Sequence, residues 1–144
     1  MALSADSTPT TAARGLNAEV VENTTVIFAG ALVGISSAGF ATNWADTTGH
    51  VFAGLAEDAA TGDTAASPAV EVSINTSGPI VKNVAVTGST GQTDVGVLVF
   101  ATDSNTYDLS ATSNVKAVGA VTRYYSGTNC DVRLFTPAEY LALN

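Results

Sequence analysis

The side chains that could carry out catalysis are few in this chain. His50 is the only histidine, and the nearest approach to a serine-hydrolase turn is the segment 34–39, GISSAG, which misses the Gly-x-Ser-x-Gly spacing. A lone histidine in front of an expected strand is usually a surface residue rather than a general base. A small hydrolase stays open as an alternative that requires His50 to lie near an activated serine.

Three further segments resemble chemical sites in part. Adjacent Glu57 and Asp58 indicate a solvated loop rather than a pair of catalytic acids. Asp103 begins a segment like a calcium loop, but the sixth position is Asp108 instead of glycine and the twelfth is Asn114 instead of glutamate. The loop 88–91, GSTG, has no lysine after it, as a phosphate loop would. We therefore expect no catalytic residue, no metal and no cofactor, and favour a binding or assembly protein over an enzyme.

The composition also restricts the partners. The 144 residues include 13 acidic and 5 basic ones, which gives a net charge of −8. Such a chain is repelled by phosphate backbones, so we expect no nucleic-acid partner. The single cysteine, Cys130, excludes an internal disulfide and is expected to be a small, buried or half-exposed side chain rather than a reactive thiol.

No export or membrane segment is expected. The first residues lack the basic and apolar regions of a signal peptide. The most apolar window, 26–41, is shorter than the roughly 20 residues that span a bilayer. We expect synthesis in the cytoplasm and no membrane partner.

Short β-rich segments separated by glycine-containing turns follow one another from residue 19. This pattern predicts an all-β fold, a small β-barrel or sandwich, over residues 19–136. The apolar run 95–101 is expected to be a strand that is buried on both faces. The other expected strands are 18–22, 24–29, 31–35, 51–56, 69–74, 80–86, 107–110, 117–125 and 130–135.

The two ends of the chain differ from this β-rich region. Residues 1–18 are rich in Ser, Thr and Pro and show no strand or helix period, so we expect an extended N-terminal arm. Such an arm is either a loose terminus or a segment that adds extended backbone to the edge of a partner's sheet. The sequence TPAE at 136–139 has the form of a capping box and predicts a short C-terminal helix over 137–144.

One pattern of glycines and valines occurs twice. The segment 30–33, GALV, precedes the segment 51–56 with Gly54, and the segment 96–99, GVLV, precedes a strand with Gly119. The intervals from Gly30 to Gly54 and from Gly96 to Gly119 are 24 and 23 residues. Glycine inside a strand admits a bulge or the close approach of another backbone. The likeness is either a duplication or ordinary β composition that recurs.

These segments, in this order, resemble the capsid decoration, or cement, proteins of tailed bacteriophages. The likeness covers roughly residues 17–135, and the polar stretch 59–67 departs from it. The segments that carry it are GALVGI at 30–35, HVFAGLA at 50–56, GVLVFATD at 96–103, TYDLS at 106–110, VGAV at 118–121 and DVRL at 131–134.

The resemblance implies a small β-barrel protein that binds the outer surface of the expanded phage head as a homotrimer. An N-terminal arm would reach over neighbouring copies of the major capsid protein. The protein would clamp adjoining capsid proteins and so stabilise the shell against the pressure of packaged DNA.

The resemblance and the composition of the arm suggest two sets of contact residues. We expect Thr8, Pro9, Thr10, Thr11 and Arg14 to contact the capsid. The candidates for the trimer interface are Trp44, Tyr140, Leu141 and Leu143.

Two alternatives use some of the same side chains. Trp44 could instead fill the end of a barrel. A receptor-binding or glycan-binding virion surface protein would use Trp44, Tyr124 and Tyr125 as a platform on which sugars stack.

Overall fold

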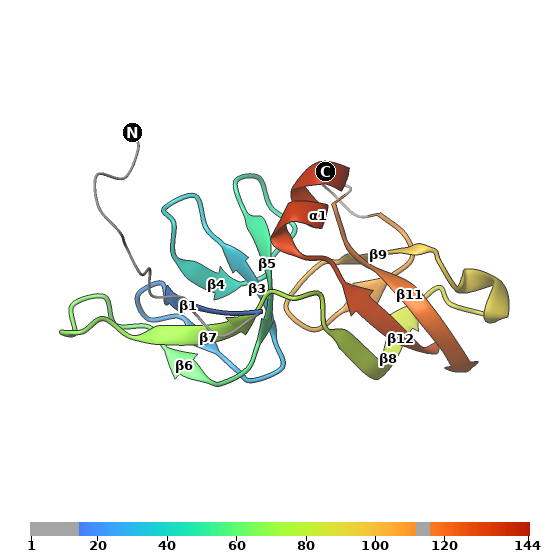
Figure 1. The fold of residues 1–144 in the computed structure, drawn as a ribbon, viewed down its shortest axis with the longest axis horizontal. Coiled ribbons are helices and arrows are strands. Elements are labelled where there is room, and N and C mark those ends of the chain that lie inside the picture. The colour runs from blue at the N-terminus through green and yellow to red at the C-terminus, as the bar shows by residue number, and fades with distance from the viewer. Residues whose placement is uncertain (1–14, 112–115) are drawn as a thin grey trace, which may run out of the picture.

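The computed structural model describes residues 15–111 and 116–144 (Figure 1). The helical elements are the short 3-10 turn η1 (Gln92–Asp94) and the helix α1 (Pro137–Leu143). The predicted all-β fold with a short C-terminal helix is confirmed. The strands are β1 (Leu16–Val20), β2 (Val26–Ile27), β3 (Leu32–Ile35), β4 (Ala41–Asn43), β5 (Val51–Ala56), β6 (Ala60–Thr61), β7 (Glu71–Asn75), β8 (Ile80–Thr87), β9 (Leu98–Ala101), β10 (Tyr107–Asp108), β11 (Ala117–Ser126) and β12 (Asn129–Leu134).

The first half of the chain forms one five-stranded unit, here called the first sheet. Its strand order is β1-β7-β5-β3-β4, and a parallel bridge between Val21 and Ala41 brings its two ends together. Apolar side chains, among them Val33, Ala53 and Ile74, form a buried core of their own. The small β2–β6 pair is an addition to this unit.

The second half forms a closed five-stranded barrel, here called the second barrel. Its strand order is β10-β8-β12-β11-β9, and the parallel pairing of Tyr107 with Val86 closes it. Figure 1 shows the two units side by side, with α1 over β5 and β11. The two five-stranded units span residues 16–134, whereas one barrel-like domain was predicted over 19–136.

The two units have the same strand order when β1, β7, β5, β3 and β4 are matched with β8, β12, β11, β9 and β10. The duplicated glycines take equivalent places in this match. Val33 pairs with Gly54, and Val99 pairs with Gly119. A register shift lies beside each of these pairs.

Hydrogen bonds around the first glycine of each pattern are also shared. The Gly30 amide donates to the Ala56 carbonyl at 2.8 Å, and the Gly96 amide donates to the Val121 carbonyl at 2.8 Å. Both glycines have positive φ, +83° and +91°, a conformation that a side chain disfavours. The repeated pattern therefore marks two structurally equivalent units, which ordinary β composition alone does not explain.

Aromatic side chains fill the space between the two units and under α1. The ring of Trp44 lies 5.6 Å from Phe52 and 5.9 Å from Tyr140, in both cases edge to face. The Trp44 indole N–H donates to the carbonyl of Ala101 in the second barrel at 2.8 Å. This contact links the first sheet to the second barrel by a buried hydrogen bond.

The apolar run 95–101 differs from its prediction. Strand β9 begins only at Leu98, and Val95, Val97 and Leu98 are 39%, 38% and 41% exposed. The expectation of a strand buried on both faces is therefore wrong for the first half of the run. The reason is that Val95 and Gly96 follow η1 in a turn, where side chains leave the barrel wall.

The C-terminal helix is capped as predicted at Thr136. The Thr136 hydroxyl accepts the Glu139 amide at 3.2 Å, and Pro137 occupies the first turn. The Glu139 carboxylate does not complete the capping box, because both of its oxygens accept from Arg133. At the other end, the Asn144 side chain bonds the Ala117 amide at 2.9 Å and the Ala117 carbonyl at 3.0 Å.

Candidate functional site

The histidine and serine that a hydrolase would need lie at the same end of the first sheet. Ile35, the last residue of β3, pairs with Val51, the first residue of β5, so Ser36 and His50 lie just beyond the ends of two adjacent strands. In the described part of the chain, Ser36 Oγ and His50 Nδ1 are each buried without a hydrogen-bond partner. A nucleophile and its base would be joined by a hydrogen bond. The pair lacks the feature that would activate the serine.

The two loops that resemble ligand sites are closed by their own carboxylates. Asp103 Oδ1 accepts the amides of Asn105 and Thr106 at 3.0 and 2.9 Å. Asp94 Oδ2 accepts the amide of Thr90 at 2.7 Å and that of Gly91 at 3.0 Å. These backbone N–H groups hold the pKa of both carboxyl groups below the usual range. Each carboxylate therefore stabilises its own turn by accepting backbone hydrogen bonds.

Other chemical sites are also missing from the residues that the structure describes. No group of three or more His, Cys, Asp and Glu side chains is placed to hold a metal ion there. Within the same residues no helix has the length and apolar character needed to cross a bilayer. Cys130, expected to be buried or half-exposed, is fully buried, and its Sγ lies 3.2 Å from the Ser89 hydroxyl.

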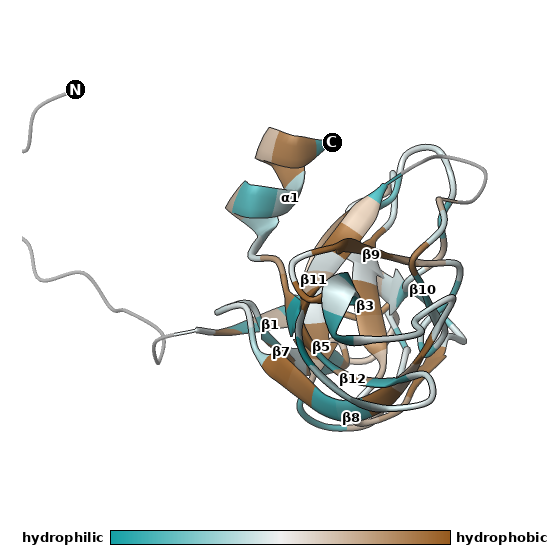
Figure 2. Ribbon diagram, turned by 90° about the vertical axis from the view of Figure 1, so that its right-hand side faces the viewer, coloured by the Kyte–Doolittle hydropathy of each residue, from teal (hydrophilic) through white to brown (hydrophobic). Residues whose placement is uncertain are grey.

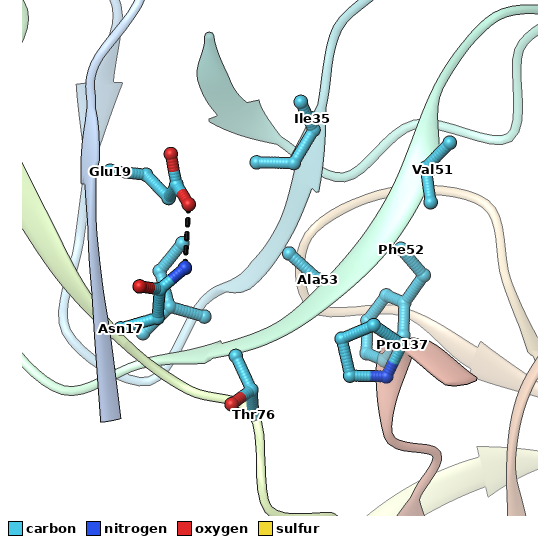
Figure 3. A pocket seen from close by; sticks show the side chains of 9 residues that line it. Asn17, Glu19, Ile35, Val51, Phe52, Ala53, Thr76 and Pro137 are labelled. Atoms are coloured by element: carbon cyan, nitrogen blue, oxygen red, sulfur yellow. Dashed lines mark hydrogen bonds between the residues drawn. The ribbon is translucent and has the colours of Figure 1, made fainter. Parts of the chain in front are cut away.

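One pocket lies beside the first sheet and has a volume of about 210 Å³. Figure 3 shows Ile35, Val51 and Ala53 on one side of it and Asn17, hydrogen-bonded to Glu19, on the other. The volume is below the roughly 300 Å³ at which small-molecule sites begin. The lining residues are Asn17, Glu19, Ile35, Val51, Phe52, Ala53, Ile74, Thr76 and Pro137.

The predicted capsid contacts cannot be placed, because Thr8, Pro9, Thr10, Thr11 and Arg14 lie outside the described residues. The strand that follows them is informative. Residues 16–18, predicted as part of the arm, belong to strand β1, and Gly15 is already held by the Thr76 amide at 2.8 Å. β1 is a terminal strand of the first sheet.

The predicted trimer contacts divide into two groups. Trp44 and Tyr140 are 1% and 2% exposed, so they are core residues of the protomer with no surface left for a second subunit. The alternative role of Trp44 as a filling side chain describes its place better. Leu141 and Leu143 are 63% and 58% exposed and remain candidates for a subunit contact.

The platform that a glycan would need is also incomplete. Trp44 is buried, and the guanidinium of Arg123 lies 4.7 Å from the centre of the Tyr125 ring. The Tyr125 hydroxyl donates to Asp131 at 3.0 Å, and the Tyr124 hydroxyl donates to the Thr90 carbonyl at 3.4 Å. The three aromatic rings therefore do not present a shared open face.

Sequence reasoning missed the exposure of three apolar side chains, Val95, Val97 and Leu98. It assigned these residues to the core because an unbroken apolar run indicates burial. The glycine at position 96 was the available signal, since its equivalent, Gly30, also stands where the chain turns into a strand. Comparison with protein-family models, curated proteins and solved structures finds no match to this chain.

Proposed function

We propose that the chain is a structural virion protein that decorates the outer surface of an expanded phage head. It would bind as a trimer, clamp adjoining major capsid proteins and stabilise the shell against packaged DNA. In this proposal the protein is made in the host cytoplasm and acts on the outside of the capsid.

The observation that carries the proposal is the order of the glycine and valine segments along the sequence. Each of these segments contributes a strand to the two units: β3 and β5 to the first sheet, and β9, β11 and β12 to the second barrel. The segments behind the resemblance are thus the framework of the fold. An acidic net charge of −8 is compatible with a partner that is protein rather than DNA.

The place of residues 1–14 in the sequence, directly before β1, supports a role for them in capsid binding. They lead directly into β1, which is an edge strand and is paired with β7 on one side. A segment that continues from an edge strand is suited to adding backbone to a sheet of another protein. Ordering about 14 residues costs on the order of 14–28 kcal/mol of backbone entropy, so the capsid surface must be extensive.

The direct test is co-sedimentation of the purified protein with expanded, undecorated heads from its own source. We expect saturable binding to expanded heads, near one copy per major capsid protein, and no binding to unexpanded shells. Deletion of residues 1–14 should leave the fold intact, because Gly15 and β1 are kept, and should abolish binding.

A chain with residues 1–14 in scrambled order is the matched control for this deletion, because its length and composition are unchanged. Binding by the scrambled chain but not by the deletion would mean that the segment acts through composition alone. Unimpaired binding of the deletion would remove the segment from the mechanism. Absence of binding to either shell would favour the receptor-binding or glycan-binding alternative, which a glycan array tests.

A further inference from the structure

Strand β1 has one paired edge and one open edge. The Thr76 amide donates to the Gly15 carbonyl at 2.8 Å, and the Val21 amide donates to the Val70 carbonyl at 2.9 Å. Because hydrogen-bonded pairs alternate in an antiparallel ladder, the even-numbered residues of β1 point their N–H and C=O groups away from β7. No described strand pairs with β1 on that side before the bridge at Val21. The residues with these outward groups are Leu16, Ala18 and Val20.

The equivalent strand of the second barrel, β8, has an edge that is protected against pairing. Pro79 directly precedes β8, Lys82 lies within it, and its ladder with β12 shifts register between Val81 and Val84. Figure 2 shows a hydrophilic segment inside this strand. Proline, lysine and bulges are devices that keep edge strands from pairing. β1, with the sequence LNAEV and an unbroken register against β7, has none of these devices and is left suitable for pairing.

The pocket beside β1 indicates which side chain fits at this edge. Asn17 and Glu19 form its β1 wall, and Ile35 and Val51 lie across from them (Figure 3). A strand added at the open edge would place its inward side chains beside Glu19 and over this pocket. A lysine or arginine there would lay its apolar stem on Ile35 and Val51 and bring its cation to the Glu19 carboxylate. The pocket thus suits one long basic side chain.

The charge of the first sheet also favours a basic partner. Residues 16–75 contain seven acidic residues and no lysine or arginine. Complementary charge speeds association, and like charges brought together oppose it. Pairing of β1 with β1 of a second copy would bring two such acidic units together. A basic segment of another protein is therefore the better occupant of this edge.

We infer that the open edge of β1 accepts an extended strand from another protein, in which basic and apolar residues alternate. The basic side chains face Glu19 and the pocket, and the apolar ones lie beside Leu16 and Val20 on the outer face. The partner is defined by its backbone and its charge. The contact goes beyond the proposed function, in which the residues before β1, rather than β1 itself, bind the capsid.

The test is the binding of a synthetic Lys-Val repeat peptide of about eight residues, which is long enough to pair with all of β1. Fluorescence anisotropy of the labelled peptide would be followed from about 1 µM to about 1 mM of the full chain, a range that covers weak to moderate affinities. We expect saturable binding that weakens as salt is added, because salt screens the charge attraction. A Glu-Val repeat peptide of the same length should not bind.

N-methylation of the peptide separates strand addition from charge attraction. Successive N–H groups of a strand point to opposite edges, so methylation of every valine or of every lysine nitrogen blocks one edge at a time. The two methylated peptides have the same charge. One should lose affinity by about tenfold or more, and the other should bind as the unmodified peptide does. Equal binding by both would mean that charge alone acts and that the inference is wrong.

Two substitutions in β1 test the same contact from the side of the protein. Ala18→Pro removes one outward N–H and leaves the bonds to β7, as proline on an edge strand can, and should lower the affinity by about tenfold. Ala18→Ser keeps the N–H and should bind normally. Glu19→Lys should lower the affinity by about tenfold or more through repulsion. Glu71→Lys, at an exposed site on β7, makes the same change in charge and is its matched control.

Thermal unfolding would verify that each variant is folded, and the methylated peptides carry the test if Ala18→Pro does not fold. Failure of the Lys-Val peptide to bind overturns the inference. Binding that appears only after deletion of residues 1–14 also overturns it, because this chain's own segment would then take the edge. So does an oligomer of the natural chain that Ala18→Pro dissociates, since a second copy would then be the occupant.

The peptide experiment needs no shell, so its outcome is separate from that of capsid binding. A chain that binds expanded heads but not the Lys-Val peptide would overturn this contact and leave the proposed function standing. A chain that binds the peptide through β1 but neither type of shell would do the reverse.

Discussion

The first sheet and the second barrel differ most on their outer faces. Both have the same strand order and the same hydrogen bonds at the first glycine, Gly30 or Gly96. In the first sheet the adjoining leucine, Leu32, is buried under the other unit, and in the second barrel Leu98 is exposed. Equivalent strands therefore pack against different neighbours, and these neighbours decide whether the outward side chains are buried or exposed.

The closures of the two units differ as well. A single bridge between Val21 and Ala41 joins the ends of the first sheet, whereas a pairing of β10 with β8 closes the second barrel. The first sheet also has the added β2–β6 pair and the pocket beside β1. Paired strands close the second barrel, whereas the first sheet is joined by a bridge and has an additional strand pair and a pocket.

The largest predicted difference between the units comes from their equivalent leucines. Leu32→Ala should lower the free energy of unfolding by about 2–5 kcal/mol, because it leaves a cavity in the contact between the units. Leu98→Ala should change it by less than about 0.5 kcal/mol in the monomer, as is usual at an exposed position. Urea unfolding followed by Trp44 fluorescence measures both, and equal losses would show that the two faces are equally covered.

The duplicated strand glycines give the next largest difference. A Cβ at Gly119 would lie 2.5 Å from the Arg133 carbonyl oxygen, and a Cβ at Gly54 would overlap the Asn75 carbonyl oxygen. Gly119→Ala should therefore cost about 1–3 kcal/mol through overpacking. Gly54→Ala should cost about 1–3 kcal/mol more, because Gly54 has a φ of +150°. The same urea titration tests this order, and a larger loss at Gly119 would contradict it.

Local sequence patterns predicted the elements of this fold well. The strand Val51–Ala56 and the Thr136 cap were placed correctly because a short apolar segment between turns and a helix cap depend on near neighbours. The strand order could not be obtained in this way, since β1 pairs with β7 across more than fifty residues. The presence of two units instead of one barrel follows from those distant pairings.

The candidate contact residues were harder to predict for a related reason. Composition identifies Trp44 and the run 95–101 as apolar, and it does not say which surface each one faces. Trp44 was expected at an interface and is in the core, whereas Val95 and Val97 were expected in the core and are exposed. Which apolar residues are left uncovered is a property of how the two units pack.

The bond from Trp44 to Ala101 tests how the units are held together. Trp44→Phe keeps most of the apolar contact with Phe52 and Tyr140 but leaves the buried Ala101 carbonyl without its donor. An unsatisfied buried group of this kind costs about 1–3 kcal/mol. Tyr124→Phe removes a hydroxyl from a more exposed bond and should cost less than about 0.5 kcal/mol. Circular dichroism during urea unfolding measures both, and equal effects would mean that the indole bond does not stabilise the contact between units.

The last prediction is a pH dependence that comes from the strand closing the second barrel. Tyr107 closes this barrel where Ala41 closes the first sheet, and burial raises the pKa of Tyr107 to about 12. The unfolded chain loses this proton near the ordinary pKa of about 10, so between pH 10 and 12 the folded state binds more protons. Stability is therefore complete below about pH 10 and falls as the pH rises, by at most about 1.4 kcal/mol per pH unit. Tyr107→Phe should remove this part of the alkaline loss, and unfolding curves with the same slope against pH for both chains would show that Tyr107 does not titrate this way.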